Sequence, residues 1–164
     1  YIFNNLVVKF SPEEKMNELK VAQLEEAIKP AGYFRKKARK LKEFTKFYLS
    51  LNGRTPTREE LLSIWGVGPE TAESMLLYAF KVPSFVVDAY TSRIFINLGF
   101  VNEKDTYDEI KQLFEHNLPQ NLNLYQEYHA LLVEHAKWYY GNKDNVRQDP
   151  LFAVLGKKRK INNC

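Results

Sequence analysis

Hydrophobic residues recur at three- and four-residue steps along most of the chain, a pattern typical of helices that bury one face. An early segment carries one such face, formed by Leu41, Phe44, Tyr48 and Leu51. A later segment carries another, formed by Tyr125, His129, Leu132, Ala136 and Tyr139. The only strand-like run is Phe85, Val86 and Val87, which is too short to build a sheet. The pattern therefore predicts an all-α fold.

Breaks in this pattern predict where the helices begin and end. Pro30 and Gly32 separate the first two helices, and Asn52-Gly53 ends the second. Thr55-Pro56-Thr57 opens the next helix, with Glu59 and Glu60 in its first turn. Asp105-Thr106 or a neighbour caps a helix that runs through Phe114, and Pro119 begins another break. After Tyr140 the periodicity ends, which predicts a loop with at most one docked turn.

Composition excludes several classes of protein. The chain has 164 residues, of which 45% are hydrophobic, so it can bury a core and is not a disordered tail. The single cysteine, Cys164, excludes a disulfide within the chain and a cysteine cluster that holds zinc or iron–sulfur. There is no membrane-length apolar run, and the first ten residues lack the basic start of a signal peptide. We therefore expect a cytoplasmic protein with no membrane partner.

The net charge of +4 is only modestly basic, but the basic residues are clustered. One group lies in a predicted helix and comprises Arg35, Lys36, Lys37, Arg39, Lys40 and Lys42. A second group lies near the end and comprises Lys157, Lys158, Arg159 and Lys160. These clusters are either a solvated helix face and a frayed tail, or surfaces that contact phosphate.

The segment from Leu61 to Ala72 predicts a helix, a tight hairpin and a second helix. The first helix runs into Gly66, and the second begins at Pro69, a residue suited to a first helical turn. Backbone amides at Gly66, Gly68 and the following turn would then point outward together, which suits a DNA phosphate. The alternative is an ordinary turn between packed helices. A dinucleotide site is disfavoured because the third glycine and a preceding strand are missing.

Asp88 follows the apolar run at residues 85–87 and precedes another predicted helix. Aspartate is a favoured helix N-cap, and Thr91 lies where the capping hydrogen bond would end. A helix N-terminus also stabilises a carboxylate anion, which suits an enzyme that needs a persistent negative charge. The two roles are compatible, because one oxygen can cap the helix while the other faces a substrate.

Together these motifs resemble the helix-hairpin-helix (HhH-GPD) superfamily of DNA glycosylases, which includes endonuclease III and alkylpurine glycosylases. The residues that carry the resemblance are G-V-G-x-x-T-A at 66–72 and V-D-x-x-x-x-R at 87–93. Residues 29–40 and 129–137 extend the resemblance, which covers roughly residues 17 to 140.

The resemblance implies one glycosylase region over residues 1–164, made of two helical subdomains with the active site at their junction. A helical-barrel part would span about 17–85 and contain the hairpin at 61–80. A second subdomain would span about 86–140, followed by a basic tail at 141–164. The family has further helices before the point where this chain begins, so we expect the N-terminal helices to be missing.

Site residues follow from the same resemblance. Asp88 would be catalytic, facing the sugar where positive charge develops. Glu70 would lie near Asp88 as a second catalytic candidate, and two close carboxylates would raise one of the two pKa values. DNA contacts would involve Gly66, Val67, Gly68, Pro69, Glu70, Thr71, Lys36, Lys37 and Lys40. A sodium or potassium ion would bind the backbone carbonyls of Leu62, Ile64 and Val67.

Two departures from the family narrow the expected reaction. Glu70 occupies the position of the Schiff-base lysine of the bifunctional members, and a carboxylate cannot form that imine. The positions of the iron–sulfur cysteines are held by Tyr140, Arg147, Pro150 and Gly156. The chain therefore resembles the cluster-free 3-methyladenine glycosylases.

We accordingly expect a monomeric, monofunctional enzyme that releases an alkylated purine from double-stranded DNA. Two alternatives stay open. One is a glycosylase with AP-lyase activity towards oxidised bases that uses another lysine, and the other is a non-catalytic DNA-binding module.

Overall fold

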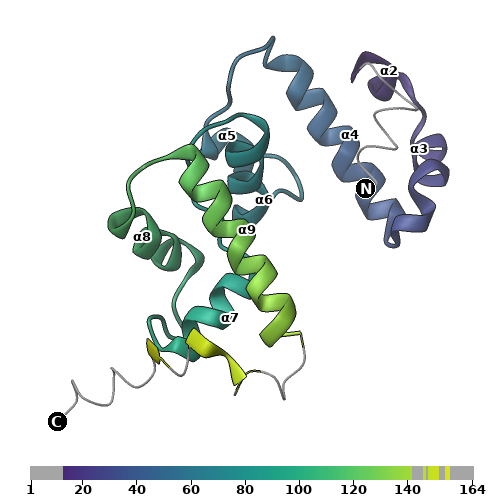
Figure 1. Ribbon diagram of the computed structural model, residues 1–164. Helices are drawn as coiled ribbons and strands as arrows, with labels where there is room; N and C mark the ends of the chain where they lie inside the picture. The colour runs from purple at the N-terminus through teal and green to yellow at the C-terminus, as the bar shows by residue number, and fades with distance from the viewer. Residues whose placement is uncertain (1–12, 142–145, 147, 152–153, 156–164) are drawn as a thin grey trace. The chain divides into compact units, whose positions relative to one another are not determined.

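The computed structural model describes residues 13–141, 146, 148–151 and 154–155. Within these residues the chain is helical and contains no strand, which confirms the all-α prediction (Figure 1). The helices form two compact units that divide between Gly68 and Pro69. The subdomain boundary near residue 85 that the resemblance implies stays a prediction.

The first unit consists of four α-helices and one short 3-10 turn in its described residues. They are α2 (Glu13–Glu18), α3 (Val21–Ile28), the 3-10 turn η1 (Lys29–Ala31), α4 (Phe34–Ser50) and α5 (Arg58–Leu62). Both α2 and α3 pack against the long helix α4 (Figure 1). The small core between α3 and α4 contains Leu24, Ile28 and Ala38, each at most 3% exposed.

Helix boundaries in the first unit lie close to the predicted breaks. Pro30 lies within the η1 turn, which begins at Lys29, and Tyr33 has a positive φ of 49° just before α4 begins. α4 ends at Ser50, ahead of the positive-φ pair Asn52 and Gly53. Thr57 then caps α5, accepting a hydrogen bond from the Glu60 amide.

Lys42 fixes α2 against α4. Its ammonium lies 2.8 Å from the Leu19 carbonyl and 3.3 Å from the Met16 carbonyl, and it also binds the carbonyl of Asn17. These carbonyls lie in the last turn of α2 and just after it, where the helix has no further amides of its own to satisfy them. Lys42 is therefore a structural residue within the basic cluster of α4.

Among the residues that the structure describes, the second unit includes helical residues at 150–151 and 154–155, together with four longer α-helices and one π-helical turn. They are α6 (Pro69–Ser74), the π-helical turn η2 (Met75–Ala79), α7 (Ala89–Leu98), α8 (Tyr107–Asn117) and α9 (Leu122–Tyr139). Thr106 caps α8 through the Glu109 amide, and α8 extends to Asn117, three residues beyond the predicted Phe114. α7 packs against α9, and α9 packs against η2.

The strand-like run at residues 85–87 becomes a buried segment without regular secondary structure, and it pairs with no strand among the residues that the structure describes. Phe85 stacks on Phe114 at 4.1 Å between ring centroids and meets the edge of Tyr125 at 5.3 Å. Phe85, Val86 and Val87 are all at most 3% exposed. These residues are hydrophobic because they are buried among helices. Their packing fixes the position of Asp88, which follows directly in the sequence.

No helix in the part of the chain that the structure describes has the length and apolar character needed to cross a membrane.

Candidate active site

Asp88 caps α7 as the sequence predicts. Its backbone is extended, with φ −94° and ψ 178°, and its Oδ1 accepts a 2.7 Å hydrogen bond from the Thr91 amide. The Ser92 hydroxyl also donates to the Asp88 carbonyl at 3.2 Å. One carboxylate oxygen is therefore held at the positive end of the helix.

The other oxygen, Oδ2, lies 3.7 Å from Nε2 of His129 in α9. This distance is too long for a hydrogen bond, so the ring acts on the carboxylate electrostatically. On its other side the imidazole Nδ1 lies 2.7 Å from the Tyr78 hydroxyl in η2. The side chains of Asp88 and His129 are 15% and 14% exposed. Three elements of the second unit thus form one cluster, which we call the Asp88 cluster: Tyr78, Asp88 and His129.

The environment keeps the Asp88 carboxyl ionised. Burial raises its pKa, but attraction to His129 and the hydrogen bond from the Thr91 amide outweigh burial and lower the pKa to about 2. Burial, followed by the Asp88 charge, raises the pKa of the Tyr78 hydroxyl. At neutral pH the cluster therefore holds an anion beside a neutral phenol.

The π-helical turn η2 sets the position of Tyr78. The Phe80 amide bonds to the Met75 carbonyl at 2.9 Å, five residues back, and the Val82 amide bonds to the Leu76 carbonyl at 2.8 Å. Such wide turns are frequent at functional sites. Neither this turn nor the partnership of Tyr78 with His129 was predicted from the sequence.

Glu70 lies in the first turn of α6 and its side chain is exposed. Within the described residues no hydrogen bond or ion pair joins it to Asp88, and the catalytic role of Glu70 stays a prediction. This geometry agrees with an acidic residue that complements the positive end of a helix. The carboxylate that α6 buries is instead Glu73, which is 0% exposed.

The hairpin starts earlier than predicted. We expected a helix to run into Gly66, but α5 ends at Leu62. The amides of Ile64 and Val67 bond three residues back, to Leu61 at 3.1 Å and Ile64 at 3.0 Å, which tightens the chain into turns. Gly66 then adopts a φ of 85°, a conformation that favours glycine.

Two basic side chains of α4 lie against this turn. A Cβ atom at Gly66 would meet the Lys40 Cε at 2.7 Å, so the lysine stem occupies the space beside the glycine. The Arg39 guanidinium lies over the ring of Trp65, 4.0 Å from its centroid, and Trp65 is 46% exposed. The α4 helix and the hairpin turn therefore form one basic surface of the first unit.

The three predicted DNA-binding lysines have different surroundings. Lys36, Lys37 and Lys40 are all exposed. Lys37 donates a 2.6 Å hydrogen bond to the Ala31 carbonyl of η1, whereas Lys40 lies beside the hairpin. Lys37 thus also stabilises the turn before α4.

The predicted cation site at the hairpin stays a prediction. Of its three carbonyls, that of Ile64 already accepts the Val67 amide. A carbonyl oxygen has two lone pairs, so this bond is compatible with coordination of a monovalent ion but does not indicate one.

A second buried cluster follows α9, where the resemblance places the cluster cysteines of other family members. Asp149 is 1% exposed, and its carboxylate accepts from the Tyr140 hydroxyl at 2.7 Å and the Leu151 amide at 2.8 Å. Nε2 of His135 lies 3.1 Å from the same carboxylate. These contacts fix the docked turn expected after Tyr140. Arg147 and Gly156, two other predicted cysteine positions, lie outside the described residues.

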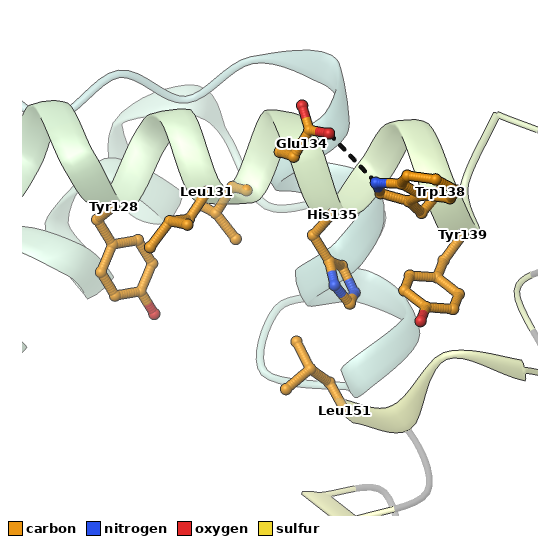
Figure 2. A pocket seen from close by; sticks show the side chains of 8 residues that line it. Tyr128, Leu131, Glu134, His135, Trp138, Tyr139 and Leu151 are labelled. Atoms are coloured by element: carbon orange, nitrogen blue, oxygen red, sulfur yellow. Dashed lines mark hydrogen bonds between the residues drawn. The ribbon is translucent and has the colours of Figure 1, made fainter.

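A hollow of about 490 Å³ lies along the C-terminal half of α9. Figure 2 shows its wall, where Leu131, Trp138 and Leu151 surround His135. Leu131 and Trp138 are 62% and 69% exposed. None of the three residues of the Asp88 cluster lines it, so this hollow and the candidate active site are separate.

Comparison with known proteins then decides the family. The model of the HhH-GPD superfamily of base excision DNA repair proteins matches residues 1–120, which include the hairpin and Asp88. The chain belongs to the HhH-GPD superfamily. The predicted resemblance is thereby confirmed.

Relatives within this superfamily carry related names. A Methanocaldococcus jannaschii protein, named provisionally as a DNA repair glycosylase, is 49% identical over 152 residues, which cover 85% of this chain and 69% of that protein. Endonuclease III of Thermotoga maritima is 34% identical over 114 residues, 68% of this chain and 53% of that enzyme. The chain thus spans between half and about 70% of the length of these two relatives.

Solved HhH-GPD structures share the fold. An endonuclease III–DNA complex aligns over 97% of this chain and 76% of the solved chain, with a TM-score of 0.81 and 24% identity. The H. pylori 3-methyladenine DNA glycosylase MagIII, bound to 1,N6-ethenoadenine, covers 83% of this chain and 75% of its own. Its TM-score is 0.69 and its identity 25%. The likeness to the first structure shows the fold alone.

Proposed function

We propose that the protein is a monofunctional DNA glycosylase, which hydrolyses the bond between a damaged base and deoxyribose and leaves the strand uncut. The observation that carries this proposal is Asp88, a mostly buried carboxylate held ionised at a helix N-terminus in the second unit. Membership of a base excision repair superfamily supports a reaction of this class. A phosphate-binding module alone would have no need of such an anion.

In the proposed reaction the damaged nucleotide first leaves the base stack, because the glycosidic bond is inaccessible within the duplex. The bond from C1′ to the base nitrogen then breaks, and its electron pair leaves with the base. Asp88 stabilises the positive charge that develops on the sugar, an effect that is strong where water is scarce. Water adds to C1′ and releases its proton to solvent.

The acidity of Asp88 favours this electrostatic role over general-base catalysis. Its pKa of about 2 makes it a weak proton acceptor at neutral pH, whereas an efficient base has a pKa near the working pH. The surroundings of Asp88 therefore stabilise its negative charge and weaken it as a base.

The proposed lack of AP-lyase activity depends on Glu70. By resemblance it stands where bifunctional members carry a lysine, and it cannot form an imine with the sugar. The names of the endonuclease III relatives favour a second candidate, a glycosylase with lyase activity that uses another lysine. Borohydride trapping separates the two, since only an imine is reduced to a stable protein–DNA adduct. An adduct would overturn the monofunctional proposal.

An alkylated purine such as 3-methyladenine is the proposed substrate. Similarity to the H. pylori 3-methyladenine glycosylase supports this class. Alkylation at N3 or N7 gives the base a positive charge, so it leaves without acid catalysis, which fits a site whose carboxyl group, Asp88, is already ionised. We propose no iron–sulfur cluster, since Tyr140 and Pro150 replace two of the cysteines that the resemblance would require.

DNA binding is proposed to begin at the hairpin and α4. Backbone amides of residues 66–71 would hold a phosphate, and Lys36 and Lys40 would add attraction that does not depend on sequence. A monovalent ion at the carbonyls of Leu62, Ile64 and Val67 would help to shape the loop. We propose that the protein acts as a monomer.

Release of free bases from damaged DNA tests the proposed function directly. The full-length protein is incubated with duplex DNA treated with dimethyl sulfate and, in parallel, with oxidised duplex DNA. Mass spectrometry then identifies the bases released. We expect methylated purines from the first substrate and none from the second. Release of oxidised bases alone would refute the substrate class, and no release from either would refute the glycosylase proposal.

A further inference from the structure

His129 is the neighbour of Asp88 that the proposed mechanism has not used. It comes from α9, 41 residues after Asp88 in the sequence, and its side chain is 14% exposed. Its Nε2 atom is fully buried and has no hydrogen-bond partner within the described residues. A buried polar nitrogen without a partner is costly, so its position needs an explanation.

The contact with Tyr78 bears on the tautomer of His129. If the Tyr78 hydroxyl donates to Nδ1 across 2.7 Å, the ring proton lies on Nε2 and faces the Asp88 carboxylate. The opposite tautomer would turn the Nε2 lone pair towards the carboxylate at 3.7 Å, and these two negative regions repel each other. The geometry therefore favours an Nε2–H that faces Oδ2 of Asp88.

A hydrogen bond between α9 and η2 fixes the positions of Tyr78 and His129 relative to each other. The Gln126 side-chain amide in α9 donates a 2.8 Å hydrogen bond to the Leu77 carbonyl in η2. This bond ties the turn that carries Tyr78 to the helix that carries His129. Among the described residues, the polar groups in contact with the His129 ring are thus Tyr78 from η2 and Asp88 from the N-cap of α7.

We propose that His129 is a positioning residue for Asp88, and that Tyr78 fixes the tautomer in which its Nε2–H faces the carboxylate. This inference rests on the proposed glycosylase function. Oδ1 is fixed by the Thr91 amide, and Oδ2 is oriented by His129, so the carboxylate cannot rotate freely. The gap of 3.7 Å leaves room for Oδ2 to move towards His129 or towards a bound sugar. Active-site hydrogen bonds commonly shorten when substrate binds.

The test compares variants that keep or remove the donor. His129→Phe keeps an aromatic ring without an N–H, whereas His129→Gln supplies an amide N–H at a similar reach. Single-turnover release of methylated bases from dimethyl-sulfate-treated duplex DNA is measured for both variants. We expect His129→Phe to lose roughly tenfold to a hundredfold in rate, with DNA affinity unchanged, and His129→Gln to recover part of it.

The dependence of the excision rate on pH distinguishes a positioning residue from a merely structural one, because loss of a structural residue would not shift this profile. Removal of the His129 donor raises the pKa of Asp88, so the acid limb of the excision rate moves to higher pH in His129→Phe. Tyr78→Phe, which frees the tautomer, gives a smaller shift in the same direction. The matched control is His116→Gln in α8, an exposed histidine whose replacement leaves rate and profile unchanged.

Three outcomes overturn the inference: a wild-type rate in His129→Phe, an unmoved acid limb, or a His129→Gln variant as slow as His129→Phe at equal thermal stability. If His129→Phe does not fold, the comparison of Tyr78→Phe and His129→Gln with wild type decides in the same way. Asp88→Asn separates this inference from the function it rests on. Full excision by Asp88→Asn refutes the proposed mechanism, whereas an inactive Asp88→Asn beside an unaffected His129→Phe refutes the role of His129 only.

Discussion

Two aspartates of the second unit each face a histidine of α9, yet their surroundings differ. Asp149 is 1% exposed and accepts from the Tyr140 hydroxyl and the Leu151 amide, with His135 at 3.1 Å. Asp88 has a 15% exposed side chain, and its histidine stands 3.7 Å away. Both carboxyls have lowered pKa values despite burial. The first carboxylate is enclosed by donors, while the second keeps an oxygen edge that other groups can reach.

This contrast separates a charge that holds the fold from a charge left available for chemistry. A buried carboxylate whose lone pairs are occupied stabilises the segments that supply its donors. A carboxylate with a loosely held oxygen gives up some of that stability and can respond to a charged transition state. The same distinction applies to the lysines of α4, where Lys42 binds three carbonyls and Lys40 lies exposed beside the hairpin.

Asp88→Asn is expected to have the largest effect on activity. Loss of the negative charge should lower base release by about 10²- to 10³-fold, the range seen when one electrostatic stabiliser of a transition state is removed. The fold should persist, because asparagine caps a helix as well as aspartate does. Base release and the melting temperature are measured together. Loss of folding along with activity would mean that Asp88 resembles Asp149 more than we infer.

Asp149→Asn should show the opposite pattern. Loss of a buried charge that Tyr140 and His135 enclose should reduce the free energy of unfolding by about 3 kcal/mol. For a chain of this length the melting temperature would fall by roughly 6–12 °C. Excision per folded molecule, measured well below the melting temperature, should match the wild type. A variant that melts normally but does not excise would reverse the assignment of the two aspartates.

Acid titration sharpens the comparison. The folded pKa of Asp149 lies below its unfolded value, so the carboxylate contributes stability above the unfolded value of about 4 and loses it as pH falls through the folded pKa. The difference in melting temperature between wild type and Asp149→Asn should therefore be full at about pH 5 and shrink by about pH 3. A difference that grows on acidification would contradict this assignment.

Much of the fold and part of the site could be predicted from the sequence. Capping by Asp88, the glycine at position 66 and the helix breaks at Pro30 and Asn52 are local features, since each depends on residues within a few positions. The end of α5 was predicted four residues too late, because hydrophobic periodicity continues through turns with three-residue hydrogen bonds. The placement of Glu70 near Asp88 was predicted from the resemblance alone, and it stays a prediction.

The partners of Asp88 could not be predicted because they are distant in sequence. The sequence pattern indicates His129 only as one member of an apolar helix face. Tyr78 lies on a π-helical turn, which changes the direction of its side chain from that expected in an α-helix. A histidine at an inward position of such a face is the one signal that was available, since a buried imidazole needs a polar partner. Asp149 offered no signal, as it lies where the hydrophobic periodicity has ended.

The smallest expected effect concerns the lysines of α4. It extends to basic residues the comparison between a charge bound within the fold and a charge free to bind a ligand. Lys40→Gln should weaken binding to duplex DNA uniformly across sequences and reduce the slope of log affinity against log salt by about 0.9, the contribution of one phosphate contact. Lys42→Gln should leave that slope unchanged and lower the melting temperature, because its ammonium binds carbonyls at the C-terminal end of α2 and just beyond it. Affinities over a salt series, with melting curves for both variants, make the measurement. Equal changes in slope would show that Lys42 contacts DNA phosphate despite its bonds to the three carbonyls. The distinction between Asp88 and Asp149 would then not extend to the lysines.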